Sequence, residues 1–142
     1  MTRRQLCDIG RLLVVVLLAA GGAPALAHHS FAVFDHTRTI TIKGAVTKFQ
    51  WTNPHAFIEV DVPSPDGSVK HFSIECTSIN MMKRLGWKST MIKAGDRVKA
   101  VVAPLLDGQP AGLLLEITLA NGEKWEPGVP AAATFKRTPE AE

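Results

Sequence analysis

Histidine is the residue type with the clearest chemical potential in this chain, and three of the five histidines, His28, His29 and His36, lie within nine residues. His28 and His29 directly follow the segment 25–27 (Ala-Leu-Ala), whose small-x-small form is typical of a signal-peptidase site. Cleavage there gives residue 28 a free α-amine with a pKa of about 8. This amine can chelate one metal together with the His28 imidazole, and the amide and imidazole of His29 offer a second chelate. Nitrogen-rich, tetragonal ligation favours Cu(II) or Ni(II). We therefore expect a copper site at His28 and His29, completed by the imidazole of His55.

An alternative interpretation stays open for the same residues. A His-His-Ser terminus is also what a disordered leader would look like, and such a peptide binds metal without a folded site. The remaining histidines have simpler explanations. His36 is expected at the surface before the first strand, and His71 is expected to face outward and pair with Asp61 across a hairpin.

The segment 50–56 (Gln-Trp-Thr-Asn-Pro-His-Ala) is the second candidate site, in a loop between two predicted strands. Trp51 offers a stacking surface, Asn53 an amide and His55 a titratable ring, while Pro54 forces the residue before it toward an extended conformation. Glu75 lies near the end of the predicted hairpin where His55 begins, so we expect a carboxylate beside the imidazole. We predict a ligand-binding role for these residues. The alternative is that Trp51 closes the end of the domain, that the Asn-Pro pair makes the turn and that His55 bonds to backbone.

The N-terminus has the order of an export signal. Arg3, Arg4 and Arg11 precede an apolar run at 12–20 that is shorter than the roughly 20 residues a membrane span needs. We therefore predict a cleavable signal peptide at 1–27, a folded domain at 28–125 and a flexible tail, rich in Pro, Ala and charge, at 126–142. The location is then periplasmic or secreted, with no transmembrane segment after cleavage.

Alternating apolar residues predict five strands, at 38–49, 57–62, 70–76, 97–103 and 113–119. In the last strand, the inward face is expected to consist of Leu113, Leu115, Ile117 and Leu119. Gly44 is expected to mark a bulge or bend in the first strand. A short helix is predicted at 79–85 with a cap at Thr77-Ser78. Three strands, a helix and two strands are the chain order of a small five-stranded OB-like barrel, a mainly β fold. An open β-sandwich is the alternative.

Cleavage also changes the charge. Of 16 basic and 13 acidic residues, removal of Arg3, Arg4, Arg11 and Asp8 leaves 13 and 12, a net charge of +1. Without a basic excess we expect no nucleic-acid partner. One cysteine remains, Cys76, which falls on an apolar face and is expected to be a buried, inert thiol.

The strings at 28–35 (HHSFAVFD) and 51–56 (WTNPHA) resemble those of DUF6152, an exported bacterial family of unknown function, and the resemblance extends through 42–46, 85–87 and 93–96. It implies an exported β-barrel domain and supplies no activity.

Three classes of function remain open. The first is an exported domain that binds a small ligand or a metal such as copper. The second is an accessory domain that binds a periplasmic or membrane protein. The third is an enzyme of unassigned chemistry, which includes copper-dependent chemistry. No nucleophile or phosphate-loop motif supports this third class.

Overall fold

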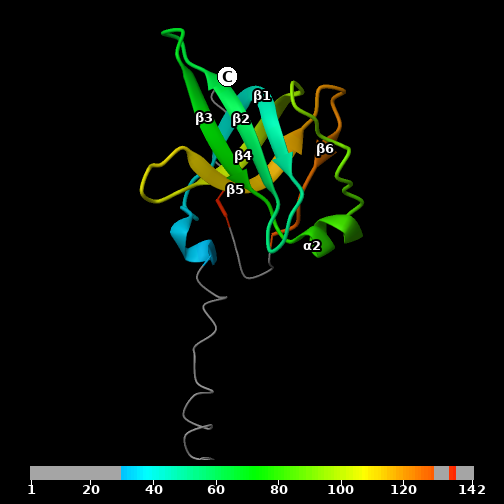
Figure 1. The fold of residues 1–142 in the computed structure, drawn as a ribbon. Coiled ribbons are helices and arrows are strands. Elements are labelled where there is room, and N and C mark those ends of the chain that lie inside the picture. The colour runs from blue at the N-terminus through cyan, green and yellow to red at the C-terminus, as the bar shows by residue number, and fades with distance from the viewer. Residues whose placement is uncertain (1–29, 130–134, 137–142) are drawn as a thin grey trace, which may run out of the picture. The chain divides into compact units, whose positions relative to one another are not determined.

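A computed structural model of the chain describes residues 30–129 and 135–136. Contacts divide the chain into the units Met1–Ser30 and Phe31–Glu142, and the description below concerns the second. The elements, in chain order, are the 3-10 helix η2 (Ser30–Val33), β1 (Ile40–Gln50), β2 (Phe57–Pro63), β3 (Val69–Glu75), α2 (Ile79–Arg84), β4 (Arg97–Pro104), β5 (Ala111–Thr118) and β6 (Lys124–Trp125) (Figure 1). The predicted signal peptide lies outside the described residues.

Five strands close into a barrel. β1 pairs antiparallel with β2 and β4, β2 with β3, and β4 with β5, while a short parallel pairing between β3 and β5 completes the circle. β6 adds two residues to β5. This is the strand order of an OB barrel, with a short helix between the third and fourth strands, and the predicted fold class is confirmed.

β1 pairs with both β2 and β4, and the irregularity in its pairing register is not at the glycine. The register shifts between Val46 and Lys48, so the bulge lies at Thr47 rather than at Gly44 as expected. Gly44 instead allows two strands to approach closely, because a Cβ there would lie 2.3 Å from the carbonyl oxygen of Asp61. Only glycine lets β1 come this near to β2 at the point where it also pairs with β4.

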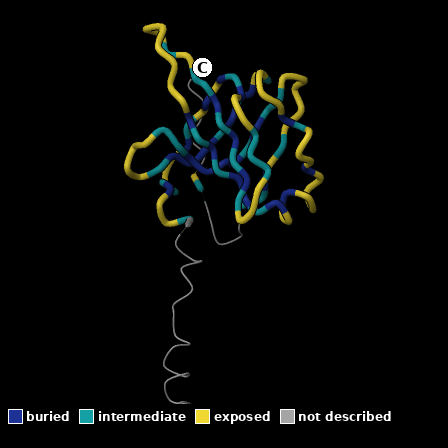
Figure 2. The backbone as a smooth tube through the Cα atoms, in the orientation of Figure 1, coloured by how far each residue is buried: buried dark blue, intermediate teal, exposed yellow. Residues whose placement is uncertain are grey.

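Apolar residues from all five barrel strands make up one buried core. Figure 2 shows the buried stretches of the backbone in dark blue. Ile58, Val60 and Ile74, which lie at alternate positions of β2 and β3, are fully buried. Met82 of α2 and Trp87, which follows the helix, belong to the same core. The helix begins at Ile79 as predicted, because Ser78 caps it by accepting a hydrogen bond from the backbone of Met81.

A second, smaller core lies outside the barrel. It contains two residues of the last strand, Leu113 and Leu115, which were predicted to face inward. A register shift in the β4–β5 ladder leaves Leu115 without a partner residue. Parity changes there, so Leu114 and Ile117 belong to the barrel core, whereas Leu113 and Leu115 pack with Phe34 in the second cluster. The sequence pattern missed this because both faces of β5 are buried.

Described parts of the predicted tail also pack on the barrel. Pro127 is fully buried, and its carbonyl accepts a hydrogen bond from the Thr77 hydroxyl. Val129 and Phe135 pack against the second cluster. The packed chain thus continues beyond Trp125, where the sequence placed the end of the domain. None of the helices in the described part of the chain is long and apolar enough to cross a membrane.

Candidate functional site

The outer face of β2 and β3 carries a row of polar side chains. Because side chains alternate along a strand, burial of Ile58 and Val60 turns Glu59 and Asp61 outward. The antiparallel register then places Ser73 opposite Glu59 and His71 opposite Asp61. In OB folds this face, with the loops between strands 1 and 2 and between strands 4 and 5, binds ligands.

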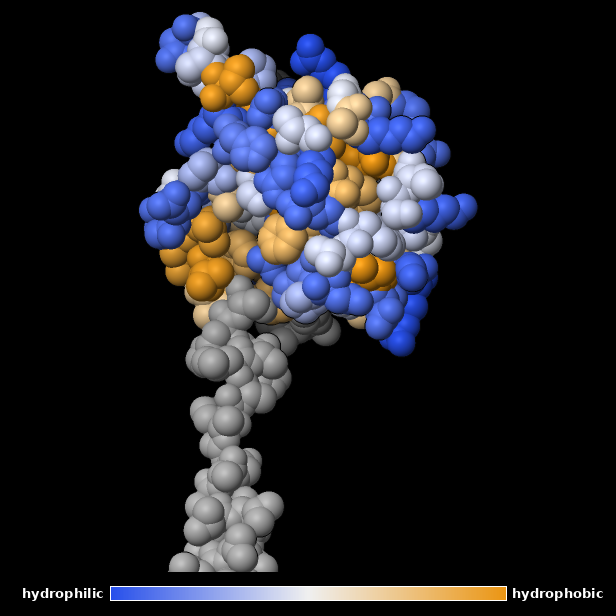
Figure 3. Space-filling model, in the orientation of Figure 1, coloured by the Kyte–Doolittle hydropathy of each residue, from blue (hydrophilic) through white to orange (hydrophobic). Residues whose placement is uncertain are grey.

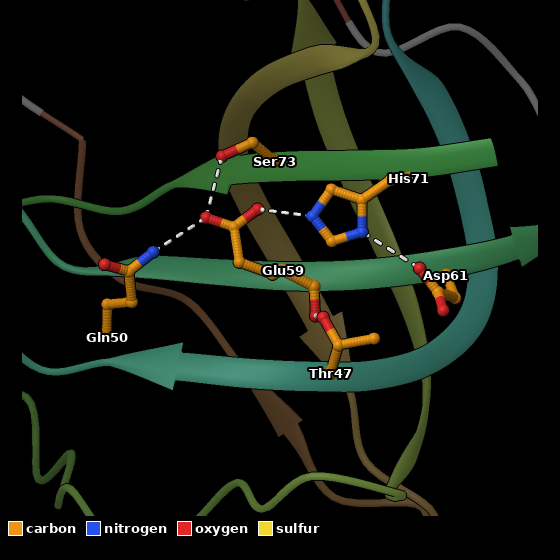
Figure 4. Close-up of polar contacts among 6 residues, drawn as sticks. All are labelled: Thr47, Gln50, Glu59, Asp61, His71 and Ser73. Carbon is orange, nitrogen blue, oxygen red and sulfur yellow. Dashed lines mark hydrogen bonds and ion pairs between the residues drawn. The ribbon is translucent and has the colours of Figure 1, made fainter.

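Glu59 is the centre of a hydrogen-bond network on this face (Figure 4). Its Oε1 accepts hydrogen bonds from Gln50 Nε2 at 2.9 Å and from Ser73 Oγ at 3.1 Å. Its Oε2 lies 3.2 Å from Nε2 of His71. The carboxylate, on β2, is therefore held by groups from the two flanking strands, β1 and β3. Sequence reasoning missed Glu59, although its outward parity between Phe57 and Asp61 was the available signal.

His71 bridges two carboxylates. Its Nδ1 lies 2.9 Å from Oδ1 of Asp61, while its Nε2 faces Glu59. A neutral imidazole donates from only one nitrogen, so both contacts are satisfied together by the imidazolium. The hydrogen bond with Asp61 raises the pKa of His71, against a smaller opposing effect of burial. The predicted cross-strand pair with Asp61 is confirmed.

His55 and Glu75 meet at the end of the same face. Beyond the strand ends, hydrogen bonds between Ala56 and Cys76 and between Ala56 and Thr77 continue the β2–β3 ladder, which brings the His55 side chain to that of Glu75. Nδ1 of His55 bonds to Oε1 of Glu75. Within the described residues this is the only polar contact of the ring, so Nε2 is the nitrogen left for a ligand. About a quarter of the side chain, 26%, is exposed.

The other loop residues divide between core and surface. Trp51 packs against the barrel core and makes an edge contact with Phe49, with ring centroids 5.4 Å apart. Asn53 is exposed and joined to Pro54 by a cis peptide bond. Trp51 thus contributes to the core, as the alternative interpretation expected, and ligand roles for Trp51 and Asn53 remain predictions.

The histidines within the described residues lie at separate places. Nε2 of His36 lies 2.9 Å from the carbonyl oxygen of Phe31, and its ring stacks on Phe135 at 4.5 Å. No group of three His, Cys, Asp or Glu side chains in the described part of the chain could hold a metal ion. The predicted metal ligands His28 and His29 lie outside the described residues.

Cys76 carries the remaining thiol of the domain. It is 1% exposed, as the apolar pattern indicated. Burial, and secondarily the charge of Glu75, raises the pKa of this thiol far above its ordinary value. A thiol with so little thiolate is a poor nucleophile and a poor metal ligand at neutral pH.

Fold and face together define a small OB-like barrel domain whose outer β2–β3 surface carries carboxylates and histidines. The chain belongs to DUF6152, a family of unknown function, whose sequence profile matches residues 15–116. A comparison with curated proteins finds no match.

Two crystal structures of the mitochondrial single-stranded DNA binding protein Rim1 from S. cerevisiae are similar to the chain at 15% identity. One has a TM-score of 0.46 and covers 61% of this chain and 94% of its own. The other has a TM-score of 0.40 and covers 67% and 98%. Likeness at this level concerns the fold alone.

Proposed function

We propose that this chain is an exported domain that binds a metal ion, copper(II) in the first instance, with Nε2 of His55 as a ligand. The observation that carries the proposal is the hydrogen bond from His55 Nδ1 to Glu75. A carboxylate on the second ring nitrogen fixes the tautomer and orientation of metal-binding histidines and increases their basicity. With Nδ1 engaged by Glu75, Nε2 is the ring nitrogen that can face a cation.

The charge of the surrounding face supports a cationic ligand. Glu59, Asp61 and Glu75 all project from the outer surface of β2 and β3. Seen from the side of β1, β2 and β3, the surface over these strands is mainly hydrophilic (Figure 3). His71 supplies the only opposing charge among the outward β2–β3 residues facing these carboxylates.

One imidazole alone binds copper weakly, so the proposal includes further nitrogen ligands. In the processed chain these are the α-amine and imidazole of His28, together with His29. This part depends on export and on cleavage after Ala27, which mass spectrometry of the N-terminus of protein isolated from its native host would test directly.

The metal proposal is tested by titrating Cu(II) into processed protein that begins at His28, with EPR spectra recorded at one equivalent. We expect at least about tenfold tighter binding than to a free His-His-Ser peptide. His55→Ala should reduce the affinity to that of the peptide, and Glu75→Gln should reduce it about tenfold, a usual effect of losing such a carboxylate. His71→Ala is the matched control, because it removes a histidine from the same face and should leave copper affinity unchanged.

Two results would contradict the proposal. Affinity of the processed protein equal to that of the peptide would show that the folded domain contributes no ligand. Equal losses in the His55→Ala and His71→Ala proteins would show that the oriented imidazole of His55 has no special role, because removal of the positive charge of His71 should not by itself weaken cation binding.

An accessory role in binding another protein is the second candidate, and an exposed apolar pair favours it. Val33 and Leu106 are 49% and 65% exposed, and a backbone hydrogen bond joins them. Figure 3 shows hydrophobic side chains gathered at the left, over η2 and the β4–β5 loop. A photo-crosslinking residue at position 106 should then capture one defined partner in cells, whereas the same residue at Val69, an exposed apolar position at the start of β3, should not.

The acidity of the ligand face supports the expectation that nucleic acid is not the partner. Phosphate contacts dominate the affinity of proteins for single-stranded nucleic acid, and carboxylates repel phosphates. Labelled oligo-dT should therefore give no change in fluorescence anisotropy with the processed protein at about 50 mM salt, where such binding is strong. Saturable binding under that condition would contradict this expectation.

A further inference from the structure

A depression of about 360 Å³ lies on the barrel where β1 and β4 pair, beside the ends of β2 and β5. Its lining includes three apolar residues, Pro63, Val98 and Leu119, and three residues with cationic side chains, Lys43, Arg97 and Lys99. Gly44 and Thr118 complete the lining. The volume is at the lower end of the range of about 300–1,000 Å³ found for small-molecule sites.

The positive charges gather here against the ordinary rules of strand pairing. Lys43 and Lys99 are directly opposite each other in the β1–β4 register. Like charges in this position destabilise a sheet, because their side chains are close and on the same face. Lys99 has an interaction partner of its own, whereas Lys43 and Arg97 form no ion pair within the described residues.

The nearest carboxylate along the same row is engaged elsewhere. Ala45 on β1 pairs with Asp61 on one side and with Arg97 on the other. Asp61 bonds to His71, toward β3 and away from the depression. Arg97 on β4 is therefore two strands away from Asp61 on β2, and Asp61 is hydrogen-bonded to His71.

We infer that this depression binds a small organic anion, with a carboxylate or a similar acidic head group on an apolar body. The guanidinium of Arg97 offers paired donors to such a head group, and the ammonium of Lys43 adds a second charge. The hydroxyl of Thr118, also in the lining, is a further donor. The apolar wall favours an anion with a hydrocarbon portion over inorganic phosphate, which would leave that surface in water.

This site is separate from the proposed metal site. None of the lining residues belongs to the Glu59, His71 or His55 contacts described above. Failure of copper binding would therefore leave the anion site untouched, and the reverse also holds.

Octanoate is a suitable probe, because it joins one carboxylate to a short hydrocarbon chain. We expect saturable binding to the processed protein by calorimetry, with amide NMR shifts confined to β1, β4 and the end of β5. Arg97→Gln and Lys43→Gln should each weaken octanoate binding at least about fivefold. Lys48→Gln is the matched control, since Lys48 is an exposed lysine on the same strand outside the depression, and it should leave the affinity within about twofold of wild type.

Competition with inorganic phosphate tests the role of the apolar wall separately from that of the cationic groups. Inorganic phosphate should displace octanoate only at concentrations at least about tenfold higher, because it cannot use the apolar wall. Urea denaturation midpoints, measured for each variant, identify any loss that comes from unfolding. The inference is overturned if octanoate does not saturate, if Lys48→Gln and Arg97→Gln have equal effects in folded proteins, or if the NMR shifts lie over η2 and the β4–β5 loop instead.

Discussion

Replacing Gly44 with alanine adds a single methyl group at the closest approach of two barrel strands. The new Cβ would lie 2.3 Å from the carbonyl oxygen of Asp61 and 2.6 Å from Cγ1 of Val60. Non-bonded heavy atoms are most favourable at about 3.5 Å or more, so the shortfall is about 1 Å. The carbonyl oxygen of Asp61 belongs to the backbone of β2, which leaves no flexible side chain to move aside.

The cost follows from moving β1 away from β2. Overpacking of a well-packed core costs about 1–3 kcal/mol, and each weakened ladder hydrogen bond adds up to about 1 kcal/mol. We expect Gly44→Ala to lower the free energy of unfolding by about 2–4 kcal/mol, which in a domain of this size lowers Tm by at least about 8 °C.

Urea denaturation followed by tryptophan fluorescence measures this loss. Gly67→Ala is the control: Gly67 lies in the β2–β3 turn with a φ of +83° and nothing within 4 Å of an added Cβ. Its substitution should cost only the strain of a left-handed residue, about 1–2 kcal/mol. If Gly44→Ala is no more destabilising than Gly67→Ala, the close approach of β1 and β2 is not a feature of the folded domain.

Three further predictions concern other parts of the barrel. The effects of Phe34→Ala and Leu115→Ala on the free energy of unfolding should depart from additivity by at least about 0.5 kcal/mol, because both residues belong to the outer cluster. The effects of Phe34→Ala and Leu114→Ala should add. The reverse pattern would contradict the register shift in β5. Because the pKa of His71 is raised in the folded state, its contribution to stability should be complete below the unfolded pKa of about 6.5 and should be lost as the pH rises through the higher folded pKa. For so exposed a ring, this contribution should be less than about 1 kcal/mol. His71→Gln should remove this dependence between about pH 6 and 8, and an unchanged pH profile would count against the imidazolium bridge. Cys76 should not react with a thiol-specific disulfide reagent at about pH 8 until urea unfolds the protein, and rapid reaction of the native protein would contradict its burial.

The sequence predicts strand register and facing well where one face of a strand is buried and the other is exposed to solvent. In β2 and β3 strict alternation fixes the register, and the pairs between Asp61 and His71 and between His55 and Glu75 follow from it. These local patterns need no knowledge of the rest of the chain, because a one-residue slip would expose every apolar side chain of the strand.

Prediction fails where both strand faces are covered. On β5 every residue from Gly112 to Leu115 is buried, so alternation carries no information about which side is the barrel interior. The covering layer comes from Phe34, near the beginning of the domain, and from Phe135, near its end. Only tertiary structure brings these segments together, which is also why part of the expected flexible tail is packed.

A net charge close to zero conceals how the charges are arranged. The outer face of β2 and β3 collects Glu59, Asp61 and Glu75, whereas the paired part of β1 and β4 collects Lys43 and Arg97. If solubility were the only demand, mixing the two signs across adjacent strands would gain cross-strand attraction and avoid repulsion. Between β1 and β2 the signs do mix, because Lys48 is opposite Glu59, whereas the Lys43–Lys99 pair of β1 and β4 gives up that attraction, as the proposed anion site would require. Lys43→Glu, which puts a carboxylate opposite Lys99, should stabilise the β1–β4 pair and weaken octanoate binding while leaving copper binding unchanged. A purely structural origin of the like-charge pair predicts unchanged octanoate binding.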